Sequence, residues 1–325
     1  MRYVLLSFAV GLCWLVTSAP ADVTSDCLVC HAGALAERRP DGSVRSLHVD
    51  GQKFFLSQHG GEGCLGCHGE LGLGPHDLAA GRLPAIDEQY APFLQGLSTS
   101  RQIALNNCMG CHKEAAVGYM ASDHGQARKA GSEIAPLCDS CHGNHYISSL
   151  DDLESPVGID QQDDTCASCH ADQKVMAQVQ LGTHVVETYD LHFHGRKRLI
   201  GDRRVAVCTS CHAPAENAHT ILKPGDPQST VNPANVDQGC GRAGCHPGVG
   251  EKFALSFGHE VPSFQVRPIV FLIGKVHYFL MSLVLGVMFI HIFLDITRRR
   301  LNYRRAARAA LAAQAAREDE AGGHA

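Results

Sequence analysis

The sequence predicts a mostly irregular fold of short α-helices, followed by one membrane-spanning helix near the C-terminus. Three observations support this: 33 glycines and 14 prolines recur along the chain, one cysteine-histidine motif repeats seven times, and one apolar segment lies near the end. Glycine and proline favour turns, so long helices are not expected before that segment. Residues 98–108 and 172–181 are the clearest candidates for short helices.

The first 21 residues have the pattern of a secretory signal peptide. Arg2 supplies the charged start, residues 3–16 are apolar, and residues 19–21 (Ala-Pro-Ala) form a small-residue cleavage site. Cys13 lies in this segment, but Leu12 before it is too large for a lipoprotein signal. An uncleaved N-terminal anchor is the alternative. In both cases we expect the region that follows to be exported.

Fourteen of the 15 cysteines lie in seven motifs in which a histidine directly follows the second cysteine. Six have the form Cys-x-x-Cys-His, and the seventh has two extra residues between its cysteines, where Gly241 and Gly244 could supply a bulged loop. The cysteines are Cys27, Cys30, Cys64, Cys67, Cys108, Cys111, Cys138, Cys141, Cys166, Cys169, Cys208, Cys211, Cys240 and Cys245. The histidines are His31, His68, His112, His142, His170, His212 and His246.

Zinc sites and redox dithiols also use cysteine pairs, but neither requires a histidine after each second cysteine. The motif is instead that of a covalently attached c-type haem, in which two thiols bind the porphyrin and the histidine is the proximal iron ligand. The sequence therefore predicts seven covalently bound haem c groups.

Residues 22–266 are expected to form one exported heptahaem cytochrome c domain. Roughly 35 residues per haem would leave the interior built mostly of stacked porphyrins rather than of packed side chains. Successive motif histidines are 37, 44, 30, 28, 42 and 34 residues apart, which is too irregular for a solenoid repeat.

Ten further histidines of this region are candidate sixth (distal) iron ligands: His48, His59, His76, His124, His145, His184, His192, His194, His219 and His259. His192 and His194 compete for one role. Because the candidates outnumber the motifs, every iron could have two histidines, which leaves no position for a substrate and favours electron transfer over catalysis. Met109, Met120 and Met176 are expected to be packing residues rather than ligands.

Three features make the chain resemble a family of periplasmic multihaem cytochromes c, related to cytochrome c3 and to the tetrahaem NapC/NirT group. These are residues 138–145 (Cys-Asp-Ser-Cys-His-Gly-Asn-His), the spaced His-Gly pairs, and residues 229–235 before the last motif. The resemblance covers most of residues 100–300. It implies that the haem region leads into the first helix of a membrane cytochrome b, with the remaining helices supplied by a separate subunit.

The apolar segment predicts a single-pass transmembrane helix over residues 267–297. Residues 276–294 contain no Lys, Arg, Asp or Glu, close to the roughly 20 residues that span a bilayer core. Six arginines follow within residues 298–308, and positive charge gathers on the cytoplasmic side. We therefore expect a bacterial inner-membrane protein with its haem domain in the periplasm and residues 298–325 as a cytoplasmic tail.

His277 and His291 lie within this predicted span and are 14 residues apart. On an α-helix they would lie about 40° apart in rotation and about 21 Å apart along the axis. Intramembrane ionisable groups are functional candidates, so both are candidate ligands of haem b shared with a partner subunit. Alternatively, His277 lies at the interface and His291 hydrogen-bonds a partner helix.

The formal net charge of −5 argues against a nucleic-acid partner. The clusters Arg196–Arg198 and Arg203–Arg204 are expected to neutralise haem propionates or to form a docking patch. We expect a membrane-anchored cytochrome that carries electrons between a quinone-linked membrane cytochrome b and periplasmic redox partners. It would be an electron-transfer subunit more than a catalyst; the alternatives are a reductase of nitrite, hydroxylamine or tetrathionate, and a structural scaffold.

Overall fold

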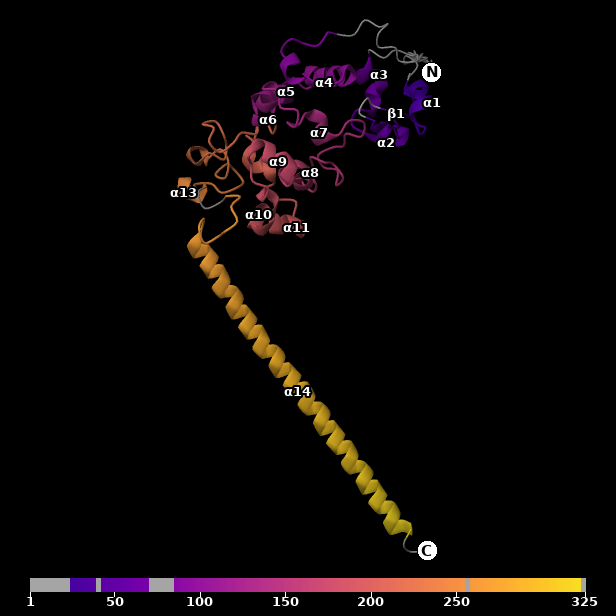
Figure 1. Ribbon diagram of the computed structural model, residues 1–325, viewed down its shortest axis with the longest axis vertical. Helices are drawn as coiled ribbons and strands as arrows, with labels where there is room; N and C mark the ends of the chain where they lie inside the picture. The colour runs from indigo at the N-terminus through magenta and orange to yellow at the C-terminus, as the bar shows by residue number, and fades with distance from the viewer. Residues whose placement is uncertain (1–23, 39–41, 70–84, 255–257, 323–325) are drawn as a thin grey trace, which may run out of the picture. The chain divides into compact units, whose positions relative to one another are not determined.

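The computed structural model describes residues 24–38, 42–69, 85–254 and 258–322. The expected signal peptide and the candidate ligand His76 lie outside these residues. The chain divides into two compact units, one that ends at His259 and one that begins at Glu260 (Figure 1).

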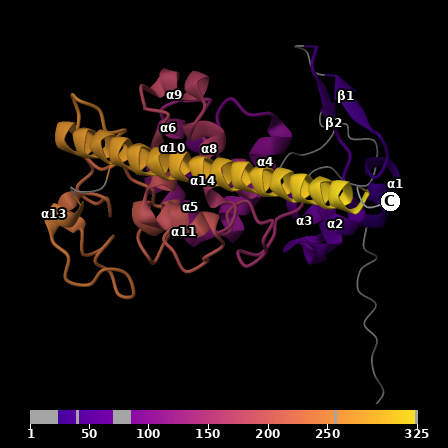
Figure 2. The ribbon, with the colours of Figure 1, turned by 90° about the horizontal axis from the view of Figure 1, so that it is seen from below.

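The first unit is mostly helical and contains many short helices, which follow one another through the unit in chain order (Figure 1). The α-helices are α1 (Thr24–His31), α2 (Gly51–Leu56), α3 (Gly63–His68), α4 (Thr99–Cys111), α5 (Lys113–Ala121), α6 (Asp123–Lys129), α7 (Cys138–His142), α8 (Gln162–His170), α9 (Gln173–Val179), α10 (Val185–Leu191), α11 (Phe193–Leu199), α12 (Cys208–His212) and α13 (Glu251–Ala254). The 3-10 turns are η1 (Gly60–Glu62), η2 (Ala91–Phe93) and η3 (Pro233–Asn235). Strands β1 (Ala36–Arg38) and β2 (Val44–Ser46) form an antiparallel pair (Figure 2).

Helix is more extensive than the expected, mostly irregular fold. Each of the six regular motifs lies at the end of a helix, namely α1, α3, α4, α7, α8 and α12. Residues three and four apart lie on the same face of a helix, so the motif spacing itself requires a helical turn. The seventh motif instead forms a loop in which the His246 amide bonds the Cys240 carbonyl at 2.9 Å. Gly244 has a φ of 83° there, as the predicted bulge requires.

The two helices predicted from the sequence are both present, as α4 and α9. The side chain of Asp172 caps α9 and accepts hydrogen bonds from the amides of Lys174 (2.7 Å) and Val175 (3.1 Å). Such a cap satisfies amide groups that the first helical turn leaves without partners.

The apolar core of the first unit is small. Its main cluster consists of Tyr90, Leu94, Leu105, Met109, Ala116 and Leu137. Only 14 hydrophobic side chains are buried in the described part of the chain. This number is small for a unit of about 230 residues, because a domain of that size normally buries roughly 70% of the surface of its unfolded chain. Met109 and Met176 are among the buried residues and Met120 packs against the cluster, which confirms their packing role.

The second unit contains α14 (Pro268–Gly322), one continuous helix of 55 residues. Among the described residues it is the one helix long and apolar enough to cross a membrane, over Pro268–Ala315. The helix continues through residues 298–322, which the sequence predicted only as a tail. The Arg299 Nε donates to Asp295 Oδ2 at 2.7 Å, one helical turn earlier, which supports this continuity.

Candidate site of paired histidines

The motif cysteines form no disulfide bonds within the described residues. Burial raises the pKa of Cys138 and of Cys211 to about 11, and that of Cys108 to about 12. Reactive cysteines need a lowered pKa, so these three values argue against reactive thiols at Cys108, Cys138 and Cys211. The pKa of Cys208 is instead lowered by its hydrogen bond with Cys166.

Six of the seven motif histidines each face a second histidine from a distant part of the chain. The ring centroids are separated by 5.8 Å in His59–His112, 6.3 Å in His68–His145, 6.1 Å in His124–His170, 5.9 Å in His142–His219, 6.0 Å in His194–His246 and 6.1 Å in His212–His259. Each second histidine is one of the ten candidates named from the sequence.

This separation is the one that a metal ion between two imidazoles requires. A metal–nitrogen bond of about 2 Å on each side, plus about 1.1 Å from nitrogen to ring centre, separates the centroids by about 6 Å. The described residues contain no group of three or more His, Cys, Asp or Glu that could hold a metal ion.

Burial favours the neutral, ligating form of these imidazoles. It lowers the pKa of His212 to about 4, and the neighbouring His259 adds to the shift. Burial also lowers the pKa values of His124, His142, His145, His170, His194, His219 and His259. A neutral imidazole keeps a nitrogen lone pair for a metal.

Of the two competing candidates His192 and His194, it is His194 whose ring faces His246. Two other candidates are exposed. His48 Nδ1 lies 3.1 Å from the Gly33 carbonyl, and His184 Nδ1 lies 2.9 Å from Glu187 Oε2. Neither forms a ring pair with a motif histidine in the described part of the chain.

The first motif histidine is oriented by a backbone contact. His31 Nδ1 lies 2.8 Å from the Leu47 carbonyl, so it can donate there and leave its Nε2 unprotonated. His277 and His291 both lie exposed on α14.

Three of the paired histidines precede a glycine that the backbone requires. A Cβ on Gly60 would lie 2.5 Å from the Phe55 carbonyl oxygen, and a Cβ on Gly125 or Gly195 would overlap the carbonyl of Tyr119 or Tyr189. These close approaches place His59, His124 and His194, which explains why His-Gly recurs in the sequence.

The structure also reveals a repeat that motif spacing did not predict. Residues 118–142 and 188–212 adopt the same arrangement, with each residue of the first copy matched by the one 70 positions later. Tyr119 donates to the Pro136 carbonyl and Tyr189 to the Ala206 carbonyl, both at 2.8 Å. The sequence signal was available in the matched Tyr, His-Gly, Arg, Gly and Cys-x-Ser-Cys-His positions, but it is hidden when only the histidine intervals are compared.

Successive motifs are linked to one another in chain order. The Cys64 amide lies 3.3 Å from Thr24 Oγ1 at the start of α1, which joins the first two motifs. Asn107 Nδ2 donates to the Cys67 carbonyl at 2.9 Å, joining the second and third.

The third and fourth motifs are joined by an ion pair. The Arg101 guanidinium donates two hydrogen bonds to the Asp139 carboxylate, at 2.8 and 2.9 Å. This contact also raises the pKa of Arg101. A hydrogen bond joins the fifth and sixth motifs: the Thr209 amide donates to Gln162 Oε1 at 2.9 Å. These links hold α4 to α7 and α8 to α12.

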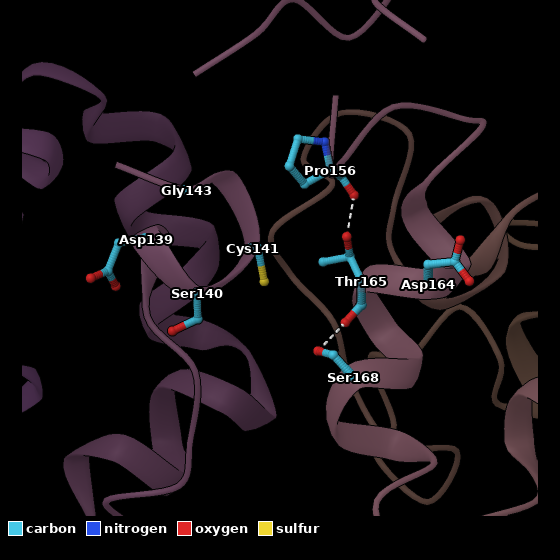
Figure 3. Close-up of a pocket in the computed structure, with 8 residues that line it drawn as sticks. All are labelled: Asp139, Ser140, Cys141, Gly143, Pro156, Asp164, Thr165 and Ser168. Carbon is cyan, nitrogen blue, oxygen red and sulfur yellow. Dashed lines mark hydrogen bonds between the residues drawn. The ribbon is translucent and has the colours of Figure 1, made fainter. Parts of the chain in front are cut away.

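An open pocket of about 390 Å³ separates the fourth motif from the fifth. Figure 3 shows Cys141 at the edge of α7 that faces Thr165 and Ser168 of α8. Finally, Arg242 bonds the Ser210 carbonyl, which joins the seventh motif to the sixth. Each motif therefore neighbours the next one along the chain.

Three arginines of the two basic clusters pair with carboxylates of the protein. Arg198 pairs with the buried Asp163, Arg203 with Asp160 at 2.9 Å, and Arg204 with Asp202 at 3.1 Å. These arginines are thus bonded to carboxylates of the protein itself.

Comparisons with known proteins add no assignment: no family model, curated protein or solved structure matches this chain.

Proposed function

We propose that this protein is a membrane-anchored seven-haem c-type cytochrome that transfers electrons. The observation that carries the proposal is the set of six histidine pairs, each with its rings about 6 Å apart and each including the histidine of a Cys-His motif. Residues of this chain would supply everything such a haem needs: two thiols for covalent attachment, and one imidazole on each side of the iron.

The small apolar core supports the proposal independently. Seven porphyrins would bring large apolar faces into a unit that has few buried side chains of its own. The protein would then fold around its cofactors, and the interlocking histidine pairs would tie distant segments together. For example, the pair His142–His219 joins residues 77 positions apart.

The direct links between successive motifs support a conducting row. Because each motif is bonded to or borders the next, the haems would lie in chain order from the first motif to the seventh. With an imidazole on both sides, the six irons at the paired histidines would have no position for a substrate. This favours electron transfer over reduction of nitrite, hydroxylamine or tetrathionate, and bis-histidine ligation generally gives a low potential.

The long helix supports a membrane anchor with a membrane partner. His277, His291 and Asp295 lie on one stripe of α14, with Gly274, Met281, Val284 and Met288 between or beside them at spacings of three and four. Ionisable groups inside a bilayer face protein rather than lipid. We propose that this stripe packs against a quinone-linked cytochrome b subunit, with the two histidines as candidate haem b ligands, and that periplasmic proteins exchange electrons with the haem unit.

The test is the composition and ligation of the full chain purified from membranes. The intact mass of the denatured protein counts the attached haems, and the electron paramagnetic resonance spectrum of the oxidised protein reports their ligation. We expect seven attached haems in the low-spin state. A high-spin haem together with turnover of nitrite, hydroxylamine or tetrathionate would instead identify a reductase.

A further inference from the structure

Two of the six histidine pairs have nearly parallel rings. The planes of His142 and His219 are inclined by 22°, and those of His212 and His259 by 19°. In the other four pairs the angle ranges from 43° to 66°. The two near-parallel pairs occupy matched places, because His142 and His212 are equivalent in the 70-residue repeat.

In the second copy, a buried threonine holds the second ring. Thr188 is 3% exposed, and its Oγ1 lies 3.0 Å from His259 Nδ1. The single hydroxyl proton is directed to the carbonyl of His184 at 2.6 Å or of Val185 at 3.0 Å. The oxygen is therefore left as an acceptor for the Nδ1–H of His259, beside the Val185 carbonyl, which also accepts from this ring. A proton on Nδ1 leaves the other ring nitrogen unprotonated.

In the first copy, a different side chain takes the same place. Gly118 is equivalent to Thr188, and a Cβ there would overlap the side chain of Asn217. Asn217 Oδ1 lies 3.3 Å from His219 Nδ1 and accepts from the His219 amide at 3.0 Å. Asn217 Nδ2 donates to the Glu114 carbonyl at 2.8 Å, which fixes the direction of the amide. The missing side chain of Gly118 thus makes room for an acceptor at the same ring nitrogen.

We propose that Thr188 and Asn217 are positioning residues that set the ring orientation of the distal ligands of the sixth and fourth haems. This proposal rests on the proposed function, because it requires an iron between the paired rings. An acceptor at Nδ1 fixes the tautomer and the plane of a ligating histidine and makes it a stronger donor to the metal. The two equivalent haems would therefore share parallel ligand planes and lowered potentials, although the acceptors differ.

The test compares Thr188→Val with Thr188→Ser in the full-length haem-loaded protein. Valine keeps the shape but removes the acceptor, whereas serine keeps the hydroxyl. Thr230→Val is the matched control, since Thr230 is also 3% exposed and its hydroxyl donates to the Cys211 carbonyl rather than to a ring. Asn217→Ala makes the same test in the first copy, should Thr188→Val accumulate poorly.

We expect Thr188→Val to change one low-spin component of the electron paramagnetic resonance spectrum and to shift one haem potential upward, with the haem count retained. Thr188→Ser and Thr230→Val are expected to keep both properties of the wild type. Unchanged spectra and potentials in haem-complete Thr188→Val and Asn217→Ala proteins would overturn the inference. Missing haem or high-spin iron in the wild type would instead refute the proposed function.

Discussion

The glycine after His59 offers a sharp test of how the backbone places a distal ligand. In Gly60→Ala, the new methyl would lie 2.5 Å from the Phe55 carbonyl oxygen and 2.7 Å from that of Phe54, against 3.4 Å for ordinary contact. The backbone must therefore move by about 0.9 Å. Overpacking of this kind lowers the free energy of unfolding by roughly 1–3 kcal/mol. A loss of 1 kcal/mol lowers the melting temperature of a domain of this size by about 2–4 °C, so we expect a decrease of about 2–12 °C.

The neighbouring Gly61→Ala is the matched control, because a Cβ there meets nothing within 4 Å. The substitution should leave the melting temperature unchanged or raise it slightly, since alanine restricts the unfolded chain. Calorimetry measures the stability of both variants. Electron paramagnetic resonance follows the iron, because movement of His59 away from its position 5.8 Å from His112 should produce some high-spin haem. Equal melting temperatures and identical low-spin spectra in the two variants would refute the reasoning.

Three further predictions follow from the histidine pairs, the buried ion pair and the division into two units. His219→Ala should convert one haem to high spin, whereas the exposed His184 can be replaced by alanine without a spectral change; the reverse result would contradict the pairing. Arg198→Met should destabilise the protein by about 3–5 kcal/mol in denaturant unfolding, because it leaves the carboxylate of Asp163, 3% exposed, buried without its partner. Adding Asp163→Asn should recover part of this loss. If the destabilisation of the double variant instead equalled the sum of those of the two single variants, the two side chains would not interact. A chain that ends at His259 should remain in the aqueous fraction with the haem spectrum of the full protein, because it keeps all six histidine pairs; sedimentation with membranes would contradict the assignment of α14 as the anchor.

The local features of the fold could be predicted because they depend on short-range sequence. The motif spacing, the helices at 98–108 and 172–181, the bulge at Gly244 and the apolar helix are all encoded within a few consecutive residues. The extent of helix was underestimated because the helical turn formed by each of the six regular motifs was not counted. The continuous α14 was also missed, since an alanine-rich tail gives no boundary signal.

The partners of the motif histidines could not be predicted in the same way. The ten candidates were identified from composition, but which histidine faces which motif depends on long-range packing. His145 follows the fourth motif by three residues and yet faces His68, and His259 faces His212 across the seventh motif. The acceptors Thr188 and Asn217 were missed for the same reason, since one copy of the repeat uses threonine and the other combines a glycine with a distant asparagine.

The ligation state of iron in the purified full-length protein tests the central claim most directly. Electron paramagnetic resonance of the fully oxidised protein, integrated against its iron content, measures the fraction of low-spin haem. Two histidines on each of six irons predict that at least six haems per chain are low-spin. A high-spin signal equal to two or more haems per chain, or an iron content far below seven haems, would contradict it.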